Sequence, residues 1–211
     1  MVKIKICGIT NEKDAFYTTT LGADFIGFNF YAGSDRKIST KMAKDIIAKA
    51  PPVIIPVGLF VNDEMDIITA VIKTCNIKHV QFHGNESAEF CGHFKKSFPE
   101  ITLIKAFKMK GEGSLRYIKQ FTDIVDYFLL DAYVPGEEGG TGETFNWDIA
   151  IEVKQFNKPI FLAGGLTPEN VVDAITKVQP YAVDVATGVE RLPRRKDFDK
   201  LKQFIVNAKK A

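Results

Sequence analysis

Two residues with acid–base side chains directly follow apolar segments that are predicted to be strands. Cys7 follows residues 2–6, and Asp131 follows residues 127–130. A thiol near the start of a helix can have a lowered pKa and act as a base or nucleophile. A carboxyl group at the end of an apolar strand can be partly desolvated, which suits it to proton donation. The alternatives are a small buried thiol and a carboxylate that caps a loop or pairs with a lysine, and position alone leaves both open.

Three further side chains could bind or activate a substrate. Arg36 ends the polar loop Gly33-Ser34-Asp35-Arg36 and could clamp a carboxylate through two hydrogen bonds, although most loop arginines are solvated. Lys105 ends a predicted strand and could form a Schiff base if it is desolvated, or pair with a charge in the barrel mouth. His83 could bind substrate or shuttle protons, and its alternative role is structural.

Glycines gather in three segments late in the chain. They are Gly139-Gly140-Thr141-Gly142, Gly164-Gly165 and Thr187-Gly188. Glycine lets backbone N–H groups approach an anion closely, and a helix N-terminus adds partial positive charge. We therefore predict a phosphate site at Gly140, Gly142, Gly164, Gly165, Thr187 and Gly188. The alternative is that these glycines only form tight turns.

The elements that must position these residues alternate regularly. Apolar runs rich in β-branched and aromatic residues predict strands at 2–6, 24–30, 53–60, 78–82, 101–106, 127–130, 159–162 and 182–185. Helical spacing between them predicts helices at 11–20, 40–48, 63–75, 86–96, 115–121, 147–156, 169–178 and 198–208. Eight strand–helix units predict an α/β fold, a single (β/α)8 TIM barrel. The main alternative is a doubly wound open sheet.

Composition limits the class of protein. The chain has 211 residues, a net charge of +2 and a sequence pI near 8.3, which give no case for nucleic-acid binding. No apolar run approaches the ~20 residues that span a bilayer, and no signal peptide is recognisable. Three scattered cysteines favour a reducing, cytoplasmic compartment. We expect one domain over residues 1–211, with no membrane partner.

Two other clusters are expected to be inert. Cys91-Gly92-His93 lies in a predicted helix whose spacing does not bring the side chains together, so we expect no metal site. The basic run at residues 191–196 is expected to be a solvated face or a weak anion-attracting patch.

Short motifs follow one another in a specific order along the whole chain. In the first half they are Lys5-Ile6-Cys7-Gly8-Ile9-Thr10, Gly27-Phe28-Asn29-Phe30-Tyr31 with Ser34 and Arg36, Val57-Gly58-Leu59-Phe60-Val61-Asn62 and Val80-Gln81-Phe82-His83-Gly84. In the second half they are Leu129-Leu130-Asp131, Gly139-Gly140-Thr141-Gly142 with Phe145 and Trp147, Leu162-Ala163-Gly164-Gly165-Leu166 with Pro168-Glu169-Asn170-Val171, and Asp184-Val185-Ala186-Thr187-Gly188-Val189-Glu190. No single motif is decisive, but their order is highly specific. Together they resemble one family, the phosphoribosylanthranilate isomerases of tryptophan biosynthesis.

The resemblance implies a barrel enzyme without a cofactor, monomeric or homodimeric, that acts on a small-molecule phosphosugar. Such enzymes convert N-(5′-phosphoribosyl)anthranilate into 1-(2-carboxyphenylamino)-1-deoxyribulose 5-phosphate by an Amadori rearrangement. By this resemblance Cys7 is the general base and Asp131 the general acid. Arg36 matches the contact to the anthranilate carboxylate, and Asp184 matches a carboxylate that helps to orient the substrate. We count His83 among the substrate-binding residues.

Two departures and one geometric expectation accompany the resemblance. Ala186 stands where the family usually has a hydroxyl residue, which predicts somewhat altered phosphate affinity without loss of activity. Tyr31-Ala32-Gly33 lacks a proline that is common there, which could loosen the loop that carries Arg36. We expect Arg36 to lie across the mouth from the phosphate loops and away from Asp131. Two other functions stay open: an aldolase that works through Lys105, and a barrel that binds a phosphosugar without turning it over.

Overall fold

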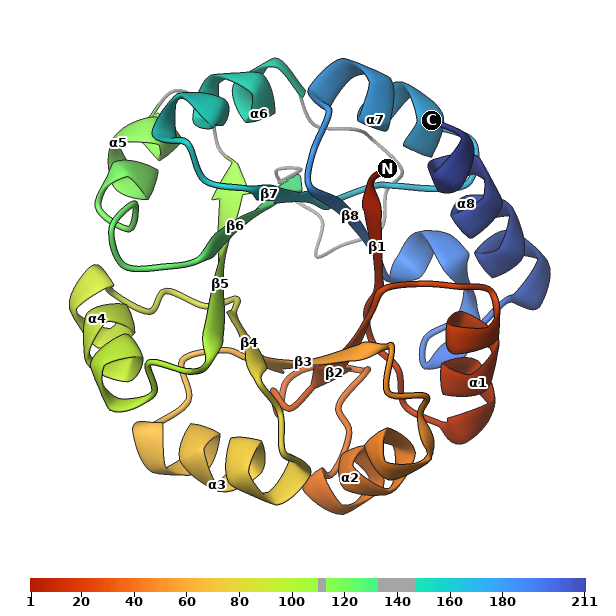
Figure 1. Ribbon diagram of the computed structural model, residues 1–211, viewed down its shortest axis with the longest axis horizontal. Coiled ribbons are helices and arrows are strands. Elements are labelled where there is room, and N and C mark those ends of the chain that lie inside the picture. Colours follow the sequence, from red (N-terminus) through yellow and green to blue (C-terminus); the bar gives the residue numbers. More distant parts are fainter. Residues whose placement is uncertain (110–112, 133–146) are drawn as a thin grey trace.

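A closed ring of eight parallel strands surrounded by helices forms the computed structural model, which describes residues 1–109, 113–132 and 147–211 (Figure 1). The strands are β1 (Lys3–Ile6), β2 (Phe25–Asn29), β3 (Ile55–Phe60), β4 (His79–Phe82), β5 (Thr102–Met109), β6 (Tyr127–Ala132), β7 (Ile160–Leu162) and β8 (Ala182–Val185). Each strand pairs with the next, and β1 pairs with β8 from Lys3↔Ala182 to Ile6↔Val185. The predicted (β/α)8 TIM barrel is confirmed, and the open sheet is wrong because the first and last strands are hydrogen-bonded.

The helices occupy the predicted gaps between strands. They are α1 (Glu12–Thr20), α2 (Thr40–Lys49), α3 (Met65–Cys75), α4 (Ala88–Ser97), α5 (Gly113–Lys119), α6 (Trp147–Val153), α7 (Val171–Val178) and α8 (Phe198–Lys210). Side-chain oxygens cap several first turns: Asn11 accepts from the Asp14 N–H, and Ser39 from the Met42 N–H. Among the described residues no helix is both long and apolar enough to cross a membrane.

Several predicted helices begin later than expected, because polar residues at their starts serve the loops instead. The helix predicted from residue 86 begins at Ala88, since the Glu86 carboxylate accepts from the N–H groups of Asn62 and Gly84. The helix predicted from residue 169 begins at Val171, since the Asn170 side chain holds the preceding turn through the Thr167 N–H. The strand predicted at 127–130 extends to Ala132, so Asp131 lies within β6.

The sequence pattern did not predict three short elements. Two are 3-10 turns, η1 (Lys154–Phe156) and η2 (Thr187–Val189). The third is the hairpin of β9 (Glu190–Leu192) and β10 (Arg195–Lys196), which lies between η2 and α8. The hairpin turns at Arg194, whose φ is 72°.

Alternation along each strand divides the core into two parts. A large apolar cluster lies between the strands and the helices and includes Ile4, Phe82 and Leu130. A smaller cluster fills the barrel interior: Phe25, Val57, Ile104, Ala106, Leu129, Phe161, Ala163 and Ala182. Residues two positions from these interior residues point to the same face of their strand. Gly27, Asp131 and Asp184 therefore face the barrel interior. Lys5 pairs in register with Phe25 and Asp184, and Gln81 pairs with Ile104, so these two side chains face the interior as well.

Candidate active site

Cys7 lies at the carboxyl end of β1, where the chain leaves the barrel. Its N–H donates to the Val185 carbonyl at 2.8 Å, which continues the ladder between β1 and β8. Gly8 follows with a φ of 77°, and its N–H donates to the Gly27 carbonyl at 3.0 Å. A Cβ on Gly27 would lie 2.9 Å from the Cys7 Sγ, so the thiol packs over the bare backbone of β2 inside the barrel.

The surroundings of this thiol differ from the prediction of a lowered pKa. Cys7 is only 8% exposed, and burial raises the pKa of its thiol above the usual value, although Lys5 and Lys196 act in the opposite direction. Desolvation disfavours the thiolate more than the nearby ammonium groups favour it. At the start of α1 the Asn11 side chain accepts from the Asp14 N–H, so this donor does not serve the thiol.

Lys5 is the charged partner of the thiol, and the sequence analysis did not identify it. Its side chain is fully buried, and its Nζ donates to the Asp184 Oδ1 at 2.9 Å. The Lys5 Nζ also lies near the thiol, since a Cβ on Gly27 would be 3.3 Å from this nitrogen and 2.9 Å from the Cys7 Sγ. Asp184 therefore does not point free into the mouth, because it pairs with Lys5 between β8 and β1. The available signal was a lysine inside an apolar strand, two residues before the thiol and hence on the same face.

Arg36 crosses over Gly8 to reach the loop after β8. A Cβ on Gly8 would lie 2.6 Å from the Arg36 Cδ, so only glycine leaves room for this path. The guanidinium pairs with the Glu190 carboxylate at 2.6 and 2.9 Å, and its Nη2 donates to the Thr187 Oγ1 at 3.2 Å. The expectation that Arg36 lies across the mouth from the phosphate loops is therefore wrong: it contacts one of them. No contact joins Arg36 to Asp131 among the described residues, as expected.

Glu190 holds two cations at once, and the sequence analysis gave it no role. Its Oε1, which accepts from the Arg36 Nε, also accepts from the Lys196 Nζ at 3.1 Å, and Lys196 is only 5% exposed. The expectation of a solvated basic run at 191–196 is therefore wrong for Lys196, although Arg191 and Arg195 are exposed. The hairpin turn accounts for the difference, since it directs Lys196 inward toward the Ala186 carbonyl, to which its Nζ donates at 3.0 Å.

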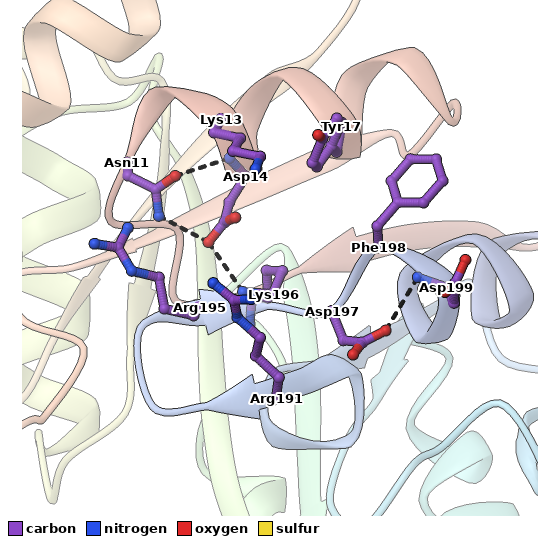
Figure 2. Close-up of a pocket in the computed structure, with 10 residues that line it drawn as sticks. All are labelled: Asn11, Lys13, Asp14, Tyr17, Arg191, Arg195, Lys196, Asp197, Phe198 and Asp199. Carbon is purple, nitrogen blue, oxygen red and sulfur yellow. Dashed lines mark hydrogen bonds between the residues drawn. The ribbon is translucent and has the colours of Figure 1, made fainter.

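Figure 2 shows how the hairpin is fixed to the first helix. The Lys196 N–H donates to the Asp14 Oδ2 at 3.0 Å, and the Asn11 side chain donates to the same oxygen at 2.7 Å. A cavity of about 390 Å³ lies beside these contacts, lined by α1, the hairpin and the start of α8. Neither Cys7 nor Asp131 lines it. A second cavity of about 270 Å³ lies at the mouth and is lined by His83, the loops after β3 and β4, the end of β5, and α5.

Asp131 lies near the carboxyl end of β6 with 28% of its side chain exposed. Its Oδ2 is 3.1 Å from the His83 Nε2, and the His83 Nδ1 is 2.7 Å from the Gln81 Nε2. The three side chains form a row from the interior of β4 to the mouth. The histidine thus contacts the candidate acid directly, which the sequence did not show, because His83 directly follows β4 and Asp131 lies on β6, with β5 between the two strands.

The predicted phosphate loops after β7 and β8 touch each other. Gly164 and Gly165 have positive φ values of 84° and 62°, and their N–H groups donate to no other described residue. Gly188 packs so tightly on the Leu166 carbonyl that a Cβ there would collide with it. Thr187 is exposed at the rim. Gly140 and Gly142, which complete the predicted site, lie outside the described residues.

Lys105 is not available for Schiff-base chemistry. It alternates with the interior residues Ile104 and Ala106, so its side chain points outward from the barrel toward α4. Its Nζ pairs with the Glu86 carboxylate at 3.0 Å and also donates to the Gly84 and Ala106 carbonyls. Its side chain is 1% exposed, so the ammonium group is paired and shielded from the mouth. The alternative of an aldolase through Lys105 is therefore not supported.

Within residues 1–109, 113–132 and 147–211, no group of three or more His, Cys, Asp or Glu side chains could hold a metal ion. Cys91 is fully buried on α4, and burial raises the pKa of its thiol to about 12. That thiol packs in the core between the strands and the helices.

Comparison with known proteins gives one consistent family. Residues 4–207 match the family model described as N-(5′-phosphoribosyl)anthranilate (PRA) isomerase. A relative of that name from Geotalea uraniireducens (strain Rf4) is 47% identical over 209 residues, which cover 99% of this chain and 99% of the relative.

Solved structures agree with this match. The crystal structure of phosphoribosyl anthranilate isomerase from Thermotoga maritima is 40% identical, covers all of both chains and superimposes with a TM-score of 0.92. A structure of such an isomerase in complex with reduced 1-(o-carboxyphenylamino)-1-deoxyribulose 5-phosphate is 38% identical over all of both chains, with a TM-score of 0.88. This chain therefore belongs to the N-(5′-phosphoribosyl)anthranilate isomerase family.

Proposed function

We propose that this isomerase converts N-(5′-phosphoribosyl)anthranilate into 1-(2-carboxyphenylamino)-1-deoxyribulose 5-phosphate with Cys7 as general base and Asp131 as general acid. The observation that carries the assignment is that both side chains face the interior at the carboxyl ends of β1 and β6 of one barrel. Parallel strands open their carboxyl ends into a common mouth, which is the working face of this architecture. A ligand that lies across the mouth can meet both groups.

The rearrangement needs one proton delivered and one proton removed. Asp131 gives its proton to the furanose ring oxygen, the bond from that oxygen to C1 breaks, and the nitrogen lone pair forms an iminium ion. The Cys7 thiolate then takes the proton from C2, and the electron pair of that bond neutralises the iminium to give an enolamine. The enolamine tautomerises to the ketone. A well-placed acid or base contributes roughly 10²–10⁴-fold to each step.

Groups at the β7 and β8 side of the mouth would hold the ends of the substrate. The N–H groups of Gly164 and Gly165, which have no partner among the described residues, suit the phosphate together with Gly188 and Thr187, and Gly140 and Gly142 stay part of this prediction. Backbone donors can bind phosphate without the hydroxyl that Ala186 lacks. Arg36 would bind the anthranilate carboxylate, for which it must share its guanidinium with Glu190. Binding at both ends orients the reacting carbons between acid and base.

The remaining roles follow from contacts inside the barrel. Asp184 holds Lys5 beside the thiol, so its part in orienting substrate acts partly through that lysine. His83 supports Asp131 and lines the cavity at the mouth. The substrate is a small molecule, and the mechanism uses protein side chains without a cofactor. A monomeric or homodimeric state, the absence of a nucleic-acid partner and a cytoplasmic location stay predictions, as does a single domain over residues 1–211.

Paired variants test the assignment. Cys7→Ser and Asp131→Asn should each lower kcat/KM by at least ~10²-fold, measured by the change in anthranilate fluorescence. Cys75→Ser, whose hydroxyl can keep the bond to the Thr40 carbonyl, and Asp123→Asn on the exposed surface serve as controls with unchanged activity. Asp131→Asn should also fail to complement a tryptophan auxotroph that lacks this step. Wild-type activity in either catalytic variant, or substrate binding without turnover by the wild type, would overturn the proposal.

A further inference from the structure

Gln81 is a polar side chain at a buried position where an apolar side chain would make the folded state more stable. It lies in the middle of the barrel interior with no exposed surface, between Leu59 on β3 and Ile104 on β5. Its amide nitrogen bonds to His83, whereas its amide oxygen is buried and has no hydrogen-bond partner among the described residues. A buried oxygen without a partner destabilises the folded state. Its contact with His83 is therefore the feature that distinguishes Gln81 from a methionine or leucine.

This contact determines which nitrogen of His83 carries the proton. An amide NH2 group can only donate, so the His83 Nδ1 must accept from Gln81, and the proton of the neutral ring lies on Nε2. This assignment follows from the orientation of the amide group in the structure, in which the nitrogen and not the oxygen lies 2.7 Å from the His83 Nδ1.

The tautomer has a direct consequence at Asp131. His83 donates from Nε2 to the Asp131 Oδ2 over 3.1 Å, so this oxygen acts as an acceptor. The acid proton then resides on Oδ1, the oxygen that His83 does not contact. With the other tautomer, Nε2 would be an acceptor and would compete with the substrate for the acid proton. After the proton has been transferred, the same donated bond stabilises the carboxylate that remains.

We propose that Gln81 is a positioning residue for the isomerase reaction: it holds His83 as the Nε2–H tautomer, and through His83 it keeps the proton of Asp131 on the oxygen that faces the substrate. The inference rests on the proposed role of Asp131 as the acid. Gln81 touches neither substrate nor reacting atoms, and its effect passes entirely through the imidazole ring.

The wild-type protein provides the first test. Long-range proton–nitrogen NMR correlations of histidine-labelled enzyme distinguish the two neutral tautomers, and His83→Phe identifies the His83 signals among three histidines. We expect His83 as the Nε2–H form. Observation of the Nδ1–H form would overturn the proposal.

The second test separates positioning from folding. Gln81→Met removes the donor and fills the same space, so the melting temperature should stay equal or rise, His83 should populate both tautomers, and kcat should fall about 10-fold with little change in KM. Leu59→Met, in the neighbouring position on β3, is the matched control with unchanged kcat. A kcat within twofold of wild type in Gln81→Met, or a fall fully explained by lost folded protein, would overturn the proposal.

A double variant completes the design. Because Gln81 acts through the ring, Gln81→Met should lower kcat no further in the His83→Phe background, and an additive loss would contradict the proposal. Asp131→Asn keeps this test distinct from that of the proposed function. If Asp131→Asn stays active, the acid assignment fails. If Asp131→Asn is inactive and Gln81→Met behaves like wild type, only the role of Gln81 fails.

Discussion

Removal of the Lys5 ammonium group should disable the Cys7 base without touching it. Burial raises the pKa of the Cys7 thiol, and Lys5 is the largest influence that lowers it. In Lys5→Met that influence is gone, so the pKa of Cys7 should rise further and the thiolate fraction at neutral pH should fall. Because only the thiolate accepts the C2 proton, kcat/KM should fall with it.

The size of the effect can be estimated because the ammonium group and the thiol lie beside the same point of Gly27. Two unit charges about 4 Å apart at an effective dielectric constant of about 20 interact by about 4 kcal/mol. That energy corresponds to a factor of about 10³ in the thiolate fraction, since about 1.4 kcal/mol is a factor of ten. We therefore expect a loss of about 10²–10³ in kcat/KM near pH 7, which becomes smaller as the pH rises toward the pKa of the thiol.

The assay is the pH profile of kcat/KM from anthranilate fluorescence. In the wild type the ascending limb should continue above pH 9, the ordinary thiol value from which burial raises the pKa. In Lys5→Met this limb should shift to higher pH. Lys3→Met, two residues earlier on the same strand and paired with Asp24 at the surface, should leave the limb in place.

Folding is controlled separately. Lys5→Met leaves the Asp184 carboxylate buried without its cation, which destabilises a protein by about 3–5 kcal/mol. The double variant Lys5→Met/Asp184→Asn removes both charges and should recover most of this stability while the shifted limb persists. An ascending limb at the wild-type pH in folded Lys5→Met would refute the reasoning, since Cys7 would then ionise without help from Lys5.

Two further predictions concern the rim and the floor of the barrel. Gly188→Ala should force the loop after β8 away from the Leu166 carbonyl and raise KM about 10-fold. The control is Gly92→Ala on α4, whose Cβ meets nothing within 4 Å; it should leave KM unchanged and raise the free energy of unfolding by about 0.5–1 kcal/mol. Equal KM values for the two variants would contradict the tight contact between Gly188 and Leu166. Burial lowers the pKa of His79 below 6.5, so the unfolded chain binds a proton there more readily than the folded protein does. The melting temperature should therefore fall as the pH drops below about 6.5, and it should fall less steeply in His79→Gln. Parallel curves of melting temperature against pH for the two proteins would exclude His79 as the cause.

The sequence predicted the parts of this protein that depend on local pattern. Alternating apolar strands and capped helices gave the eightfold order, and the rule that barrels work at their carboxyl face directed attention to Cys7 and Asp131. The strand that carries Asp131 ends two residues later than predicted, and this does not change the face on which the side chain lies. The sequence can predict the face on which a strand residue lies, because side-chain alternation in a strand depends only on neighbours along the chain.

The missed features all depend on which distant residues meet. Lys5 and Asp184 pair only because β1 closes on β8, and Arg36 reaches Glu190 across the intervening Gly8 loop. The raised pKa of Cys7 depends on how completely the barrel excludes water, which spacing in a sequence does not measure. Gln81 resembled an ordinary polar residue of a short strand until its single partner was visible.

The contact between Lys5 and Asp184 joins residues 179 positions apart, and it lies on the seam where the first strand meets the last (Figure 1). During synthesis β1 leaves the ribosome long before β8 has been made. Lys5 therefore stays solvated until almost the whole polypeptide has emerged. Contacts of such long sequence separation form slowly, because a large loop has to close first. The reactive thiol thus acquires its cation only when the ring closes, and an unfinished nascent chain carries an ordinary cysteine.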